Sequence, residues 1–209
     1  MDFNSGAPIL KTCSINSVNS ASTISDKNGN LLFYGDSDSV WNKNHSVIPN
    51  SGNLFVAGAN QFINFLPFPC NDSLFYIIHS GVAPSNTSIL NIYYSVINIH
   101  ANGGLGAITI QNVIIDSNII IATAMARHAN NKDYWIVYQM SDTNIYHARQ
   151  ISSSGIGPVV VSQGGSNKYY DRGLIKLSPH ASHFVNCNTI GNTIDYFDFD
   201  NNSGLLPNW

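Results

Sequence analysis

The chain alternates short runs of aromatic and β-branched residues with short polar turns along its whole length. Runs of this kind, bounded by Asn, Gly, Ser, Asp and Pro, are typical of β-strands. Four runs form an aromatic-rich series whose last member is degenerate: NLLFYG (30–35), SLFYIIH (73–79), DYWIVYQ (133–139) and HFVNCN (183–188). At residues 120–128 a helical turn competes with a strand, and the β-branched start of this segment favours extended structure.

A second phrase, a strand-like run followed by a polar turn and a glycine, occurs five times. The copies are DFNSGAPI (2–9), HSVIPNSGNL (45–54), YYSVINIHANGGLG (93–106), YHARQISSSGIG (146–157) and DYFDFDNNSGLLP (195–207). Steps of 46, 52, 51 and 49 residues separate their glycines at positions 6, 52, 104, 155 and 204. In a chain rich in strand signals, a period near fifty predicts the blades of a β-propeller.

We therefore expect an all-β fold and one β-propeller domain over residues 1–209. Its approximate repeats are 7–52, 53–104, 105–155 and 156–204, each of roughly 50 residues with four strands, within a larger propeller of about seven blades. The first and last copies of the phrase are whole repeats apart, and a ring closed by these four units alone is the alternative. A truncated ring would leave blade edges unpaired, and self-association through these edges is then expected.

The composition narrows the classes of partner. Only 10% of the residues are charged, compared with about 25% in an average globular domain, and 28 Asn and 25 Ser take their place. The net charge of −3 leaves no basic stripe for nucleic acid. No transmembrane segment is expected, because Asp116, Ser117 and Asn118 interrupt the longest apolar stretch. Met1 is followed at once by Asp2 and a turn, so no signal peptide is predicted either.

No arrangement of residues predicts a catalytic site, a metal site or a cofactor. Glu is absent and no GxSxG motif occurs, so paired-carboxylate hydrolysis would need two Asp residues. Asp26, Asn28 and Asn30 have the spacing of the first ligands of a calcium loop, but the DKNGN sequence favours a hairpin turn. His180 and His183 form the closest histidine pair and lack a third ligand nearby. Three widely spaced cysteines, at positions 13, 70 and 187, are expected to be buried or half-buried free thiols.

If a ligand binds, loops from several repeats are expected to meet at one face of the propeller. The candidate ligand-binding residues are Asp36, Asp38, Trp41, His79 and Asp142. An aromatic face for sugars is a further possibility, made by Tyr34, Trp41, Tyr134 and Trp135. Their positions on the repeated strands favour packing in the core instead.

Four segments carry a resemblance to a known family. ISDKNGNLLFYGDSDSVWNKNHSVIPNSG (24–52), YYSVINIHANGGLGAI (93–108), RHANNKDYWIVYQMSDTNIYHARQISSSGI (127–156) and GLIKLSPHASHFVNCNTIGNTIDYFDFDNNSGLLPN (173–208) resemble the blades of large Bacteroidetes propeller proteins. These proteins are described as gliding motility-associated, and many carry a type IX secretion sorting domain. The chain departs from their pattern in GDSDS (35–39), where the family usually has a Thr-Asp/Asn-Gly-type turn after FY. It also departs in HASHF (180–184), where the family normally has a proline followed by an Asp-Gly turn.

The resemblance implies an extracellular or surface-attached, WD40-like β-propeller without defined catalytic residues. The main hypothesis is a non-catalytic binding or scaffold module of an exported bacterial protein, related to gliding motility or adhesion, with a protein or glycan as its ligand. The alternative hypothesis is a polysaccharide hydrolase or lyase. It would require Asp, His and Tyr residues with shifted pKa values to gather in the propeller channel.

Overall fold

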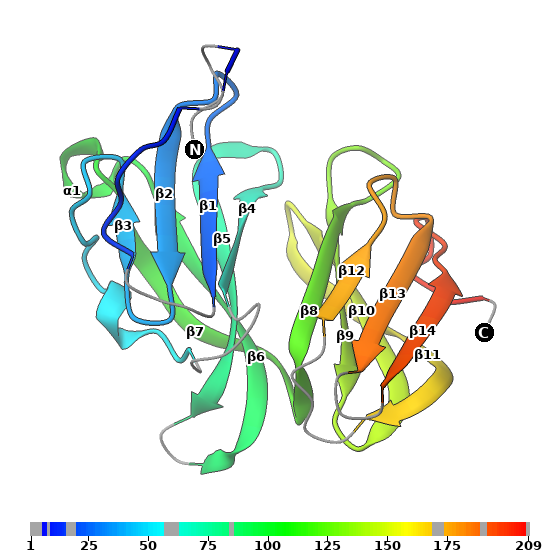
Figure 1. Ribbon diagram of the computed structural model, residues 1–209. Coiled ribbons are helices and arrows are strands. Elements are labelled where there is room, and N and C mark those ends of the chain that lie inside the picture. Colours follow the sequence, from blue (N-terminus) through cyan, green and yellow to red (C-terminus); the bar gives the residue numbers. More distant parts are fainter. Residues whose placement is uncertain are drawn as a thin grey trace.

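The structure is a computed structural model that describes residues 6–7, 9–15, 20–56, 63–83, 86–168, 174–188 and 192–207. Consecutive stretches of these residues form four antiparallel sheets (Figure 1). The first sheet contains β1 (Ala21–Ser25), β2 (Leu31–Asp36) and β3 (Val40–Asn42). The second contains β4 (Ile63–Phe68), β5 (Asn71–Ala83), β6 (Asn86–Asn98) and β7 (Ala107–Ser117). Within each of these sheets, neighbours in sequence are neighbours in space.

The third and fourth sheets follow the same order. The third contains β8 (Ile119–Arg127), β9 (Tyr134–Met140), β10 (Thr143–Ser152) and β11 (Gly155–Lys168). The fourth contains β12 (Leu174–Leu177), β13 (His183–Asn188) and β14 (Thr193–Asp198). Helical structure in the described residues is limited to η1 (Ser51–Asn53) and α1 (Ala101–Gly104). The first strands of sheets one and two contact each other, β1 with β4, and so do those of sheets three and four, β8 with β12. Sheets two and three instead meet through β6 and β8.

The aromatic-rich runs are the second strands of the four sheets, namely β2, β5, β9 and β13, as the repeat predicts. The segment at residues 120–128 is extended, within β8, which confirms the preference for a strand there. The all-β class is thus confirmed. The propeller arrangement stays a prediction, because no closed ring of blades is detected among the described residues.

The sheets are out of phase with the repeats proposed from the sequence. In the later sheets the glycine-bearing phrase begins within the third strand, in β6, β10 and β14, and its glycine follows that strand. Strand β7 begins after this glycine and β11 begins at it, but both pair with the strand that precedes the glycine. The expected units 105–155 and 156–204 therefore begin inside a sheet, and the first and last sheets contain three described strands. Most of the N-terminal copy of the phrase, at 2–9, lies outside the described residues.

Three apolar clusters hold the sheets together face to face. The first cluster joins sheets one and two and includes Phe33, Val40, Ile63, Phe75 and Ile77. The second joins sheets two and three and includes Tyr76, Ile78, Ile92, Ile136 and Tyr138. The third joins sheets three and four and includes Trp135, Val137, Tyr146, Phe184 and Phe197.

Strand β9 shows why its sequence reads as a continuous apolar run. Side chains alternate across a strand, so Ile136 and Tyr138 enter the second cluster while Trp135 and Val137 enter the third. Strand β5 divides its side chains between the first and second clusters in the same way. A sheet that is covered on both faces needs apolar residues at successive positions, and this explains the aromatic runs in sheets two and three.

The fourth sheet lacks a described sheet on its outer face. There Ile194 is 72% exposed and Tyr196 is 59% exposed, both on β14. The β13 residues that pair with them are Cys187 and Val185, whereas Phe184 of β13 is fully buried in the third cluster. The degenerate fourth copy of the aromatic run is thus a strand with one covered face. In Figure 1 this sheet lies at the opposite side of the molecule from β1, β2 and β3.

Gly204, the glycine of the last repeated phrase, lies close to the Trp135 ring, and a substitution at this position would test the packing. Gly204 has φ +78°, and a Cβ atom there would lie 2.7 Å from the Trp135 ring. We expect Gly204→Ala to lower the free energy of unfolding by about 1–3 kcal/mol, because both the left-handed backbone and the ring contact oppose a side chain. Urea unfolding followed by circular dichroism would measure the change.

Gly52→Ala is the matched control for this substitution. Gly52 belongs to the same repeated phrase, but a Cβ atom there meets nothing within 4 Å and its backbone is not left-handed. The control should be neutral or slightly stabilising. Equal losses for the two variants would contradict the contact with Trp135.

Candidate functional site

The loop candidates of the first sheet are parts of one hairpin. Asp36 ends β2 and is only 3% exposed, and its Oδ1 accepts hydrogen bonds from the backbone N–H groups of Asp38 (2.8 Å) and Ser39 (3.1 Å). Asp38 itself is exposed at the turn. Trp41 is buried and stacks on Tyr34, with ring centroids 5.3 Å apart. This hairpin uses Asp36 to close its turn and Trp41 to pack its strands.

The other two candidates lie in different sheets. His79 is 1% exposed within β5, where Nδ1 lies 3.0 Å from the Phe55 carbonyl and Nε2 lies 3.0 Å from Ser95 Oγ. Burial lowers the pKa of His79 to about 4, although the bond to Phe55 acts in the opposite direction. Asp142 is exposed in the β9–β10 turn with φ 59°. No described contact joins His79 or Asp142 to the Asp36 hairpin, so the five candidates do not make one site.

Turns from three successive sheets instead surround a hollow of about 600 Å³, which we call the turn hollow. The first turn, between β1 and β2, contributes residues 25–28, and the second, between β4 and β5, contributes residues 67–70 with Asp72 and Phe75. The third turn, between β8 and β9, contributes Arg127, Asn131, Lys132 and Tyr134. Its volume lies in the usual range for ligand sites.

Side-chain oxygens that accept backbone N–H groups fix the turns around the turn hollow. Asp26 Oδ1 accepts from Asn28 (2.8 Å) and Asn30 (2.9 Å), and Asp26 Oδ2 accepts from Asn30 Nδ2 (3.0 Å). Chiefly the side-chain bond from Asn30 lowers the pKa of Asp26. In the third turn, Asn130 Oδ1 accepts from Lys132 (2.9 Å) and Asp133 (3.0 Å). This bonding accounts for the Asp26, Asn28 and Asn30 spacing as a hairpin turn.

The wall of the turn hollow combines apolar rings with charged groups. Pro67, Pro69 and Phe68 line it, and Phe68 stacks on Tyr76 with centroids 4.7 Å apart. Arg127 lies over the Tyr134 ring, 5.5 Å from its centroid, and donates to the Asn131 carbonyl at 2.9 Å. Two lysines, Lys27 and Lys132, add mobile positive charge to this rigid frame. Flat apolar surface beside such donors suits a sugar or a peptide.

A polar network that the sequence reading missed joins sheets two and three. Asp116, near the end of β7, accepts at Oδ2 from Tyr138 Oη (2.9 Å) and lies 2.8 Å from His147 Nδ1. Arg149 Nη2 lies 3.6 Å from the same oxygen, and Arg149 Nε donates to Tyr138 Oη at 3.1 Å. In the sequence, Asp116 is recognisable only as a polar residue that interrupts an apolar stretch, and no sequence feature indicated that Tyr138, His147 and Arg149 are its partners.

Hydrogen bonds to the Asp116 carboxylate favour its ionised state over the opposing effect of burial. Burial alone raises the pKa of Asp116, but hydrogen bonds from His147, the Ser117 N–H and Tyr138 outweigh it, and the net pKa lies below the ordinary value. Burial also raises the pKa of Tyr138 above its usual range. Asp116 therefore remains ionised and Tyr138 remains protonated near neutral pH.

The remaining residues that the sequence singled out either do not contact one another or are packed in the core. His183 lies 3.3 Å from Asp198 Oδ1 and stacks on Tyr196, and no described contact unites it with His180. Tyr34, Trp41, Tyr134 and Trp135 are all buried, as the preference for core packing predicts. The cysteines are free thiols, but Cys13 and Cys70 are exposed rather than buried, because both lie outside the apolar clusters. Among the described residues, no three His, Cys or Asp side chains gather as metal ligands, and no helix could span a bilayer.

The Asp116 network should stabilise the junction of sheets two and three. We expect Asp116→Asn to lower the free energy of unfolding at pH 7 by about 1.5–3 kcal/mol, because the ionised acceptor of several bonds is lost. Since the pKa of Asp116 is depressed in the folded state, its contribution is present above the unfolded-state pKa and is lost as pH falls. The difference between variant and wild type should accordingly shrink below pH about 4.

Urea titrations at pH 7 and pH 3 would measure this difference. Asp142→Asn is the control, since Asp142 is exposed in a turn that Asn tolerates, and its effect should stay within about 0.5 kcal/mol. A penalty for Asp116→Asn that is independent of pH would argue against an ionised Asp116.

His79 should make the fold sensitive to mild acid. Its folded-state pKa of about 4 lies below the ordinary histidine value of 6.5, so the unfolded chain binds a proton that the folded chain does not. Stability should therefore fall by up to about 3 kcal/mol as the pH drops from about 6.5 to about 4. In His79→Gln this part of the pH dependence should vanish, whereas exposed His180→Gln should retain it. An unchanged slope in His79→Gln would refute the neutral, buried state of His79.

Comparison with known proteins gives no relative from which a function could be transferred. No protein-family model, no curated protein and no solved structure matches the chain. The resemblance of the repeated segments to Bacteroidetes propeller blades therefore remains a prediction from the sequence, and the function has to be argued from the surface of the molecule.

Proposed function

We propose that the chain is a non-catalytic binding module, a β-propeller portion of an exported, surface-associated bacterial protein that binds a glycan or a protein. The turn hollow is the observation that carries this proposal, because equivalent turns of three successive sheets contribute to it. Low charge and abundant Asn and Ser are compatible with an exported surface, and the blade-like repeats support the propeller. Roles in adhesion or gliding motility belong to this proposal through the family resemblance.

The structure of the turns supports binding rather than large rearrangement. Side chains hold the first and third turns from within, through the bonds to Asp26 and Asn130, so the frame is formed before a ligand arrives. A pre-formed site avoids part of the entropy cost of ordering loops on binding. The lysines at the rim can adjust to the ligand, while the rings of Phe68 and Tyr134 are held by aromatic neighbours and by Arg127.

A panel of neutral β-glucan and uronic-acid oligosaccharides, together with a phage-displayed peptide library, would test binding. We expect at least one ligand whose affinity falls about tenfold in Lys27→Glu or Lys132→Glu, since charge reversal at the rim costs about 1–2 kcal/mol when a polar contact is lost. Lys176→Glu, on the exposed side of β12, is the matched control and should bind normally. Binding that both rim variants leave unchanged would place the ligand elsewhere.

The Asp116 network favours a second candidate, a polysaccharide hydrolase or lyase. It brings an Asp, a His and a Tyr within hydrogen-bond distance, the residue types that such an enzyme would need, with shifted pKa values for Asp116 and Tyr138. These side chains saturate one another, which suits a structural junction better than a free acid and base. Release of new reducing ends or unsaturated products from the same oligosaccharides, abolished by Asp116→Asn, would replace the binding proposal with this one.

A further inference from the structure

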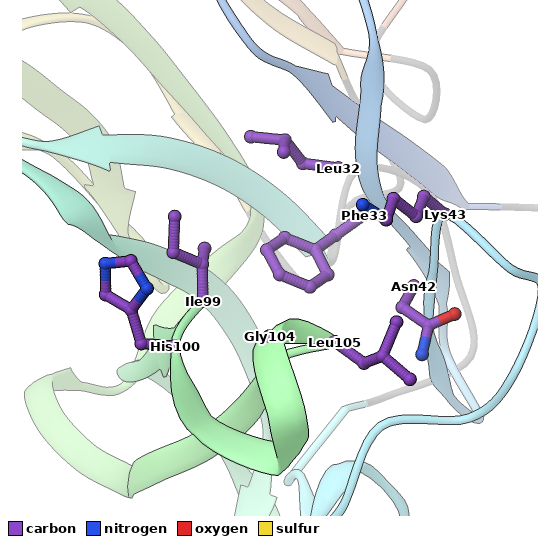
Figure 2. Close-up of a pocket in the computed structure, with 8 residues that line it drawn as sticks. All are labelled: Leu32, Phe33, Asn42, Lys43, Ile99, His100, Gly104 and Leu105. Atoms are coloured by element: carbon purple, nitrogen blue, oxygen red, sulfur yellow. The ribbon is translucent and has the colours of Figure 1, made fainter.

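A second, smaller pocket lies between the first sheet and the turn that joins β6 to β7. Its volume is about 260 Å³, below the usual range for drug-sized ligands, so it suits a small molecule or one side chain. Leu32, Phe33, Ile99 and Leu105 make its lining mostly apolar (Figure 2). It shares no lining residue with the turn hollow, so binding in this pocket does not depend on the proposed function.

The wall formed by the β6–β7 turn is well ordered by its own bonds. The Leu105 N–H donates to the Asn102 carbonyl at 3.3 Å, and the Gly106 N–H donates to the Ala101 carbonyl at 3.0 Å. Gly106 has φ +85°, and a Cβ atom there would lie 2.6 Å from the Phe33 ring, so the ring rests directly on the backbone of this turn. The apolar part of the pocket is therefore formed by packed groups of two sheets.

Asn42 places an unused hydrogen-bond donor in the pocket wall. Its Oδ1 accepts from the N–H groups of Asn44 (2.9 Å) and Ser46 (3.3 Å), which fixes the orientation of the amide, since only the oxygen can accept. Asn42 is 1% exposed, and its Nδ2 has no hydrogen-bond partner among the residues that the structure describes. A buried donor without an acceptor is unfavourable and requires an explanation.

The neighbouring residue supplies a positive charge at the same end of the pocket. Lys43 is exposed and lines the pocket, and no carboxylate of the described residues lies within ion-pair distance of it. In Figure 2 Asn42 and Lys43 stand on the same side of the Phe33 ring, opposite His100. An ammonium and an amide donor that line one pocket with an apolar floor are complementary to a carboxylate attached to an apolar group.

We propose that this pocket binds a small monocarboxylate with a short branched apolar group, such as a free aliphatic acid or the C-terminal residue of a peptide. The carboxylate accepts from Asn42 Nδ2 and faces the Lys43 ammonium, and the apolar group lies on Phe33 and Ile99. The Asn42 nitrogen is closed off from water, and the half-buried Leu105 lines the same pocket. Access of a carboxylate to this donor therefore requires a side chain of the lining to change rotamer.

N-acetyl-L-leucine and 4-methylpentanoate are the probes, with N-acetyl-L-leucinamide as the uncharged control. Each is titrated into ¹⁵N-labelled protein, and the backbone signals of residues 42–43 and 99–106 are followed by NMR. We expect saturable shifts at these residues with millimolar or tighter affinity for an acid, and binding of the amide at least tenfold weaker. If only N-acetyl-L-leucine binds, the ligand is the C-terminus of a peptide. If both acids bind equally, the ligand is a free aliphatic acid.

Asn42→Asp is the decisive variant, because the carboxylate keeps the Oδ1 acceptor of the turn but replaces the free donor with negative charge. We expect it to weaken binding of the acid at least tenfold, Lys43→Gln to weaken it about fivefold, and Lys176→Gln to leave it unchanged. The ¹⁵N spectrum of each variant reports whether the fold is retained. Equal affinity for acid and amide, unchanged affinity in a folded Asn42→Asp, or no shifts at residues 42–43 and 99–106 would each overturn the proposal.

Discussion

The two middle sheets are buried on both faces, and this packing holds the four sheets together. Strands β5 and β9 each send alternate side chains into two different apolar clusters, so that every sheet is fastened to the next through the second strand. Transfer of these rings out of water is the main favourable contribution to such packing. The turns, the polar networks and both pockets take their positions from this stack of sheets.

Polar groups in this chain act mainly within turns and between sheets. Asp26, Asp36, Asn42 and Asn130 all use a side-chain oxygen to accept backbone N–H groups of their own turn. This local bonding explains why a chain with so few charged residues still has well-defined connections. Where a polar side chain lies between sheets, as Asp116 does, several partners from the neighbouring sheet surround it, because an unpaired buried charge would be costly.

The two pockets have different chemistry because they lie at different junctions. The turn hollow collects exposed turns of three sheets and mixes rings with charges of both signs, which suits an extended ligand such as a glycan or a peptide. The smaller pocket is formed by Phe33 packed on one rigid turn, with an unpaired amide donor and one lysine at its end. A surface-binding role for the chain is compatible with both, since neither pocket depends on the other.

Local structure could be predicted from the amino-acid sequence, namely the strands, the Asp26 hairpin, the extended segment at 120–128 and the all-β class. These features follow from side-chain periodicity and turn chemistry within a few residues. The packing of one sheet on another brings residues 25–28, 67–70 and 127–134 into one hollow, places Asp116 against His147 and Arg149, and buries His79. Such contacts depend on how one sheet packs on the next, and the spacing of residues along the chain does not encode that packing directly.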